Sequence, residues 1–212
     1  MAFTTFLFDL DGTLIDSVEL ILRSYRHTLL AHRGHVPPDE QWLRGLGTPI
    51  RVQLRQWSQD PEEIEEMART YSKYNMEHHD SLVRPYDGVV RTVTELKQRG
   101  KRIGLVTSKA RTGAVRGLRV AGLEPSFDTI VGADDVQNPK PHAEPVLVAL
   151  ERLGAIAKEA VFVGDSRHDL VSGRAAGVAT AAALWGPFDR SQLEDLEPDY
   201  WLERPDEVGK LS

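Results

Sequence analysis

Two aspartates, Asp9 and Asp11, directly follow an apolar segment near the start of the sequence and are the first residues with an evident chemical use. Residues 3–8 are aromatic and β-branched, which is typical of a β-strand, and Asp11-Gly12 is a dipeptide that opens a loop. Ligands of an open parallel sheet bind at the carboxyl ends of its strands. We therefore expect both carboxylates at the mouth of a site, where their mutual repulsion requires a proton or a bound cation.

This fragment alone is equally compatible with a polar strand end followed by an Asp-Gly turn that has no chemical role. A calcium loop is excluded, because that motif requires glycine at its sixth position and glutamate at its twelfth. Counted from Asp9, those positions hold Leu14 and Leu20. The choice between a reactive site and a simple turn therefore depends on what stands at the other strand ends.

Polar residues also follow two later apolar segments that are predicted to be strands. Thr107-Ser108-Lys109 comes after residues 102–106, and Gly164-Asp165-Ser166-Arg167-His168-Asp169 comes after residues 160–163. Lys140 lies between them in the proline-stiffened loop Asn138-Pro139-Lys140-Pro141, ahead of a predicted helix. Because all these residues are expected at one edge of the sheet, their shared location favours a common function.

Each group also has an ordinary structural interpretation when taken alone. Thr107-Ser108 could be a helix N-cap, and Lys140 could be a surface lysine. Asp165 and Asp169 could be a cap and a first-turn acid of one helix. The joint occurrence of all four groups at one edge favours a reactive site over these separate interpretations.

Phosphoryl transfer requires a nucleophile, neutralisation of phosphate charge and a proton for the leaving oxygen. Asp9 is the candidate nucleophile, which would form an aspartyl-phosphate, and Asp11 could protonate the leaving group and later activate water. Thr107 and Ser108, with the backbone N–H groups that follow, could bind phosphate oxygens, while Lys140 adds a fixed positive charge. The carboxylates expected to hold Mg²⁺ are Asp9, Asp11, Asp165 and Asp169.

The composition describes a globular protein with room for one domain and a smaller insert. The chain has 212 residues, 41% of them hydrophobic, a formal net charge of −6 and no cysteine. This charge offers no basic surface for nucleic acid, and the lack of cysteine excludes disulfides and thiolate metal sites. No apolar run approaches ~18 residues, and no signal peptide is evident. We therefore expect a cytoplasmic protein without a membrane or nucleic-acid partner.

The predicted elements fall into two regions. From residue 83 onward, strands and helices alternate, which predicts an α/β fold with an open, Rossmann-like parallel sheet and helices on both faces. Residues 16–82 contain helical patterns only. We therefore predict a core domain of residues 1–15 and 83–212 and an inserted helical-bundle cap domain of residues 16–82, with hinges near residues 15–16 and 83–85.

Four stretches resemble the ordered motifs of the haloacid dehalogenase-like phosphohydrolases, and the helical insertion resembles the cap of their phosphoglycolate phosphatase and phosphoglucomutase branch. The resemblance implies that Asp9 is the nucleophile and that Asp11 is the acid and base, with its backbone carbonyl on Mg²⁺. It also implies that Asp165 ligates the metal directly, whereas Asp169 acts as a ligand's partner or through water. The stretches are Asp9-Leu10-Asp11-Gly12-Thr13-Leu14, Val106-Thr107-Ser108, Lys140-Pro141 and residues 164–169.

A closer likeness is to the pyrophosphatases of this superfamily, and it implies inorganic pyrophosphate as the substrate. Phosphoglycolate hydrolysis and a phosphoglucomutase-type transfer are the alternatives. The sequence departs from the pyrophosphatase pattern at Pro141-His142-Ala143-Glu144 and in the cap loop 44–49. The likeness is carried by residues 74–75, 78–80, 95–97, 107–111, 134–136 and 180–182, with Trp185.

The substrate's remaining charge needs further cations or donors that face Asp9. From the cap we expect Arg44, Gly45 and Thr48 to contact the substrate, with Arg51 and Lys73 as further cationic candidates and Arg111 as the candidate from the core. His78-His79 are adjacent on a predicted helix and are expected at a solvated helix end. The sequence leaves open whether the protein is a monomer or a dimer.

Overall fold

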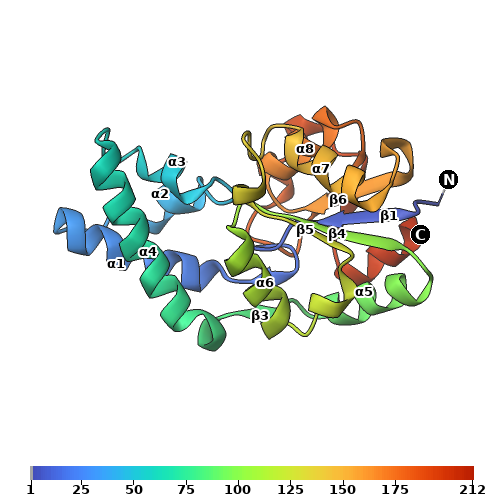
Figure 1. Ribbon diagram of the computed structural model, residues 1–212, viewed down its shortest axis with the longest axis horizontal. Coiled ribbons are helices and arrows are strands. Elements are labelled where there is room, and N and C mark those ends of the chain that lie inside the picture. The colour runs from blue at the N-terminus through green and yellow to red at the C-terminus, as the bar shows by residue number, and fades with distance from the viewer. Residues whose placement is uncertain (1) are drawn as a thin grey trace.

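The centre of the molecule is a six-stranded parallel sheet, seen in the computed structural model, which describes residues 2–212 (Figure 1). The strand order is β5-β4-β1-β6-β7-β8, so β1 lies between β4 and β6. All the neighbouring pairs in this sheet are parallel. The strands are β1 (Thr5–Phe8), β4 (Arg102–Val106), β5 (Thr129–Val131), β6 (Ala160–Gly164), β7 (Ala179–Ala183) and β8 (Tyr200–Leu202).

Helices cover both faces of the sheet, and successive residues of β1 pack into opposite apolar clusters. Phe6 and Phe8 join the cluster formed with α5 (Val89–Gln98) and α6 (Arg111–Val120). Leu7 joins the other cluster, which includes residues of α7 (Glu144–Leu153). A strand that is buried on both faces needs apolar residues at every position, which explains the continuous Phe6-Leu7-Phe8 run.

The helical block, residues 18–82, lies beyond the carboxyl ends of the strands, while both termini lie at the opposite end of the sheet (Figure 1). It comprises α1 (Val18–Arg33), α2 (Asp39–Leu43), α3 (Ile50–Leu54) and α4 (Pro61–Leu82). The block has an apolar cluster of its own, in which Tyr25 stacks on Trp42 with ring centroids 3.9 Å apart. We propose on this basis that residues 16–82 form a separate cap domain.

Two short strands join the helical block to the sheet region. β2 (Ile15–Asp16) and β3 (Arg84–Pro85) pair antiparallel, so the chain leaves and re-enters at one place. Arg84 donates to the carbonyl oxygens of Asp80 and Ser81 and thereby satisfies acceptors at the end of α4. Hinge motion at this connection stays a prediction.

The predicted α/β fold is confirmed, and the predicted strands and helices are present with shifts of about two residues at some ends. The first strand, expected for residues 3–8, spans Thr5–Phe8, and Asp169 lies in the first turn of α8 (Arg167–Ala175). The expectation for His79 is wrong: its side chain is fully buried, because the end of α4 lies against the sheet region. In residues 2–212, no helix is both long and apolar enough to cross a membrane.

Candidate active site

Lys140 is the centre of a buried cluster at the carboxyl edge of the sheet. Its Nζ donates to Asp9 Oδ1 at 2.8 Å, to Asp169 Oδ1 at 2.5 Å and to the carbonyl oxygen of Val106 at 3.1 Å. The side chains of Lys140, Asp9 and Asp169 are at most 5% exposed. Three residues that are far apart in the sequence thus meet at the ends of β1, β4 and β6.

The first turn of α7 holds the loop that carries Lys140. The Glu144 carboxylate accepts from the backbone N–H groups of Gln137 and Asn138 at 2.8 and 2.9 Å, and from the Asn138 side chain at 2.8 Å. These bonds fix the loop just before Lys140, which explains how a long side chain can have a single buried position. Glu144 therefore acts on the site through the backbone.

Three carboxylates in this cluster could hold a metal ion. Asp9, Asp165 and Asp169 are buried, and each offers an oxygen within 4.8 Å of the other two. Burial, together with the negative charge of Asp169, raises the pKa of Asp9 to about 7, and the same two causes raise the pKa of Asp165. Lys140 supplies one positive charge against three carboxylates, so this donor set fits a divalent cation.

Asp165 and Asp169 differ in how their oxygens are used. Asp169 Oδ2 accepts from the backbone N–H of Ser166 at 3.0 Å and from its hydroxyl at 2.6 Å, while Oδ1 accepts from Lys140. Asp165 Oδ1 accepts from the Thr13 hydroxyl at 2.6 Å. Asp169 thus orients Lys140, whereas the second oxygen of Asp165 has more freedom to bind a metal.

Gly12 allows the loop after β1 to pass against Asp165. Its φ is +92°, and a Cβ at this position would lie 2.4 Å from Asp165 Oδ2. A side chain here would be both strained and in collision with the carboxylate. Glycine at this position is therefore needed for the loop after β1 to pass against Asp165, which follows the neighbouring strand β6.

Asp11 lies outside the three-carboxylate group and is held by one residue of the sheet region and one at the start of the helical block. Its Oδ1 accepts from Lys109 Nζ at 2.8 Å and from the Ser17 hydroxyl at 2.6 Å. Burial alone would raise the pKa of Asp11, but Lys109 and Ser17 hold it below its ordinary value. The carboxylate is therefore ionised and already paired in this conformation.

Thr107 and Ser108 stand at the end of β4. The Thr107 hydroxyl accepts from the backbone N–H of Lys109 at 3.2 Å, which is a local capping bond of the kind the sequence allowed. The Ser108 hydroxyl is buried and has no hydrogen-bond partner within the described chain. Because buried polar groups are normally paired, this hydroxyl is available for an oxygen of a bound ligand.

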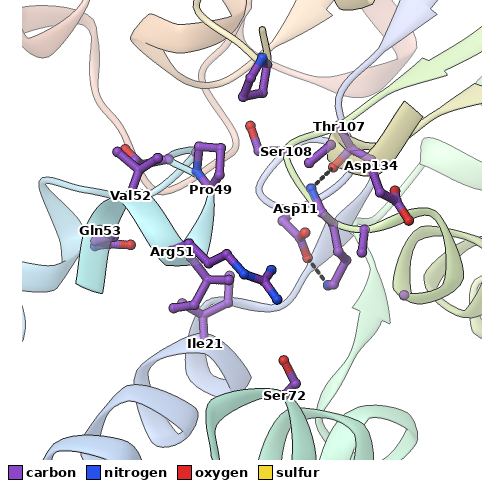
Figure 2. A pocket seen from close by; sticks show the side chains of 18 of the residues that line it. Asp11, Ile21, Pro49, Arg51, Val52, Gln53, Ser72, Thr107, Ser108 and Asp134 are labelled. Carbon is purple, nitrogen blue, oxygen red and sulfur yellow. Dashed lines mark hydrogen bonds and ion pairs between the residues drawn. The ribbon is translucent and has the colours of Figure 1, made fainter. Parts of the chain in front are cut away.

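A cavity of about 500 Å³ separates the sheet edge from the helical block, and Figure 2 shows residues of both regions around it. Asp9, Asp11, Thr107 and Ser108 line it from the sheet side. The lining residues from the block are Ile21, Tyr25, Leu46, Gly47, Thr48, Pro49, Ile50, Arg51, Val52, Gln53, Tyr71, Ser72, Asn75 and Met76.

The cap residues expected from the sequence are only partly at this cavity. Thr48 and Arg51 line it, but Arg44 and Gly45 do not. Arg44 is exposed and its Nε donates to the Glu40 carbonyl oxygen at 3.3 Å, back along its own helix. Arg51 therefore replaces Arg44 as the leading cap cation.

Two residues without a role in the sequence analysis also reach the site. Lys109 binds Asp11, and His168 Nε2 lies 3.2 Å from the Thr48 hydroxyl across the two regions. Gly47, with φ +87°, lets the cap loop approach Ser166, whose Oγ would lie 2.9 Å from an added Cβ. Lys109 and His168 stand within the motifs already quoted, but sequence spacing does not give the partner of either.

Comparisons with known proteins agree on one family. Residues 6–183 match the model for the haloacid dehalogenase-like hydrolases. The chain is 43% identical over 204 residues to a protein named pyrophosphatase PpaX from Bacillus cereus, with 96% of this chain and 94% of the relative covered. Its identity to the PpaX protein of Halalkalibacterium halodurans is 41% over 202 residues, covering 95% and 93% of the two chains.

Solved structures give the same result. A haloacid dehalogenase-like hydrolase from Bacteroides fragilis superposes with a TM-score of 0.92 at 28% identity, covering 97% of this chain and 99% of the other. A protein from Lactobacillus plantarum, named as a phosphoglycolate phosphatase, has a TM-score of 0.90 at 25% identity over the whole of both chains. With the sheet topology and the match over residues 6–183, these findings show that the chain is an enzyme of the haloacid dehalogenase-like hydrolase family.

Proposed function

We propose that this protein is a Mg²⁺-dependent phosphohydrolase that works through an aspartyl-phosphate at Asp9, with inorganic pyrophosphate as its substrate. The observation that carries the proposal is the buried cluster in which Lys140 holds Asp9 at the floor of the cavity, beside Asp165 and Asp169. A carboxylate that is fixed by a cation and faces a cavity is oriented for attack on phosphorus.

The metal-binding residues in this proposal are Asp9, Asp165, the backbone carbonyl of Asp11, and Asp169 through water. The fit rests on three buried carboxylates whose oxygens converge within 4.8 Å, of which Asp9 and Asp169 pair with the single lysine Lys140. When bound, Mg²⁺ would neutralise charge on the phosphoryl group and on the carboxylates. The aspartates would be ionised in that state, which suits Asp9 as a nucleophile.

The reaction has two steps with balanced atoms. Asp11 is ionised while Lys109 is bound to it, so the first step starts after Asp11 has taken up a proton from solvent. An oxygen of Asp9 then forms a bond to phosphorus, the bond from phosphorus to the bridging oxygen breaks, and Asp11 gives that oxygen this proton. Water then attacks the phosphorus of the aspartyl-phosphate, Asp11 takes the water's proton, and phosphate leaves with Asp9 restored. Throughout both steps Lys140 keeps Asp9 in place, because Asp169 and Val106 fix its ammonium group.

Thr107 and Ser108 would bind the non-bridging oxygens of the reacting phosphate. The unpartnered Ser108 hydroxyl supports this role, since it is buried at the cavity wall. Burial alone would lower the pKa of Lys140, but Asp169 and Asp9 hold it above its ordinary value. Lys140 thus keeps its positive charge over the working pH range and offsets the charge of the reacting group.

The preference for pyrophosphate is supported by the relatives named PpaX, which are 41–43% identical over nearly the whole chain. Phosphoglycolate is the second candidate, because the Lactobacillus plantarum structure carries that name and has the same fold along its entire length. A phosphomutase of the phosphoglucomutase type is the third, since it would use the same nucleophile and return the phosphoryl group to a sugar. We propose further that the helical block closes over the cavity and excludes water during phosphoenzyme formation.

The test measures kcat/KM for pyrophosphate, phosphoglycolate and several sugar phosphates in one Mg²⁺ buffer. We expect pyrophosphate to have the highest value and Asp9→Asn to abolish release of phosphate from every substrate. A higher value for phosphoglycolate would overturn the substrate assignment and leave the mechanism in place. Conversion of β-glucose 1-phosphate to the 6-phosphate, in place of hydrolysis, would identify a mutase.

A further inference from the structure

Lys109 has no role in the proposed reaction, although it binds Asp11, the acid and base of that reaction. Lys109 follows β4, its side chain is 16% exposed, and its Nζ donates to Asp11 Oδ1 at 2.8 Å. It also lines the cavity. The oxygen of Asp11 that it occupies is therefore unavailable to a leaving group while this ion pair lasts.

Arg51 supplies the second cation at the cavity, from the opposite wall. In the view of Figure 2 its guanidinium extends toward the side of the cavity where Asp11 lies. The guanidinium pairs with Glu65 through Nε at 2.5 Å and Nη2 at 3.0 Å, and 61% of the Arg51 side chain is exposed. Such an exposed pair contributes little to stability, so Arg51 can exchange its partner at low cost.

Among the described residues that line the cavity, Arg51 and Lys109 are the cationic side chains. The other candidates from the sequence are elsewhere: Arg111 donates to Ile130 and Asp135, and Lys73 is exposed away from the lining. An anion that enters the cavity beyond the reach of Lys140 therefore meets these two cations.

The position of the leaving group follows from the chemistry. Asp11 must reach the bridging oxygen in order to protonate it, so the departing half of the substrate lies beside Asp11. Lys109 is already within hydrogen-bond distance of that carboxylate. A departing phosphate carries several further anionic oxygens that can accept from Lys109, whereas an aryl oxide has no anionic oxygen besides the one that leaves phosphorus.

We infer that Lys109 and Arg51 form a subsite for an anionic leaving group, and that Lys109 moves from Asp11 to the departing phosphate. This inference rests on the proposed function and deepens it. When Lys109 moves from Asp11 to the departing phosphate, its ammonium group stays paired with an anion. The free-energy cost of releasing Asp11 is therefore small when the leaving group is anionic. A neutral leaving group leaves Lys109 on Asp11. Pyrophosphate is thus selected in two ways: its second phosphate binds the two cations, and it also releases Asp11 from Lys109.

The experiment compares pyrophosphate with p-nitrophenyl phosphate, whose leaving group has no phosphate. We expect Lys109→Met to lower kcat/KM for pyrophosphate by about 10–100-fold, the loss of one charge-assisted contact, and for p-nitrophenyl phosphate by less than about 3-fold. Lys109→Arg should restore most of the pyrophosphate activity. Arg51→Met should act in the same direction, by about 10-fold.

The matched controls are Arg55→Met, an exposed arginine of the same helical region that is absent from the cavity lining, and Lys158→Met, an exposed lysine at the opposite edge of the sheet. Retained hydrolysis of p-nitrophenyl phosphate shows that each variant is folded. Equal losses on both substrates would overturn the subsite and leave the proposed function standing. Hydrolysis of neither substrate by the wild-type protein would overturn both.

A second readout uses imidodiphosphate, a pyrophosphate analogue, as an inhibitor of p-nitrophenyl phosphate hydrolysis. We expect its inhibition constant to rise about 10–100-fold in Lys109→Met and to stay unchanged in Lys158→Met. Inorganic phosphate, which needs no second subsite, should inhibit both variants equally. An unchanged inhibition constant for imidodiphosphate in Lys109→Met would contradict the inference.

Discussion

The two walls of the cavity differ in how their charged groups are held. On the sheet side, Lys140, Asp9 and Asp169 are at most 5% exposed and each has a buried partner. On the helical side, Arg51 is 61% exposed and pairs with Glu65, which is itself 44% exposed. The groups that would do the chemistry are thus fixed before a substrate arrives, whereas those that would select it are free to move. Changes in the buried Lys140 cluster should affect every substrate, and changes at Arg51 should distinguish between substrates.

The largest effect is expected from Lys140→Met. It would leave the carboxylates of Asp9 and Asp169 buried without their cation, which costs about 3–5 kcal/mol of stability. We expect kcat to fall by about 10²–10³-fold or more for all phosphate substrates alike. Steady-state kinetics and urea unfolding measure the two effects, and Lys158→Met serves as the control. A loss confined to one substrate would show that the buried cluster also selects between substrates.

The second effect is a pH dependence of the metal-free protein. The pKa of Asp9 is about 7 in the folded state against 3.8 for the ordinary group, and the pKa of Asp165 is raised as well. Between these values the two groups bind more protons in the folded protein than in the unfolded chain, so their contribution to stability falls as pH rises from about 4 to about 7. We expect Tm in EDTA to fall by about 5 °C or more over this range.

Two comparisons sharpen that experiment. Mg²⁺ should raise Tm more at pH 8 than at pH 5, because ionised carboxylates bind the cation. Asp165→Asn should flatten the pH dependence, since it removes one of the raised carboxyl groups. A Tm that rises with pH in EDTA would contradict the crowding of carboxylates on the sheet side.

A smaller effect is expected where the two walls touch. The Thr48 hydroxyl and His168 Nε2 are 3.2 Å apart and join the cap loop to the sheet edge. Thr48→Val removes this contact while keeping the shape, so we expect KM for pyrophosphate to rise about 2–10-fold with little change in kcat. Substrate titrations measure both constants. Equal falls in kcat and kcat/KM would place Thr48 with the chemical groups and blur the distinction between the walls.

The sheet side could be predicted from the sequence because parallel strands bring their ends together wherever they lie in the chain. Asp9, Thr107 and Asp165 each follow an apolar run, and Lys140 stands in a loop before a helix. Parallel strands in one sheet are enough to place all four residues at the same edge. The partners of Asp169 were less evident, because spacing alone does not show that one oxygen caps α8 and the other binds Lys140.

The helical side could not be predicted in the same way. Arg44 and Arg51 both lie near the loop that faces the sheet, and only the packing of α2 and α3 decides which one reaches the cavity. His79 shows the same limit: its helix has a solvated face, but its own side chain is buried where α4 meets the sheet region. Periodicity gives the faces of a helix and leaves open which neighbour covers them.

The central claim is that Asp9 carries the phosphoryl group between substrate and water. Mixing the protein with pyrophosphate and Mg²⁺, quenching in acid within one turnover and analysing the peptides by mass spectrometry tests it directly. We predict one phosphoryl group on the peptide that contains Asp9, formed at least as fast as kcat and absent in Asp9→Asn. Turnover without any such label, or a kinetically competent label on another residue, would contradict the account.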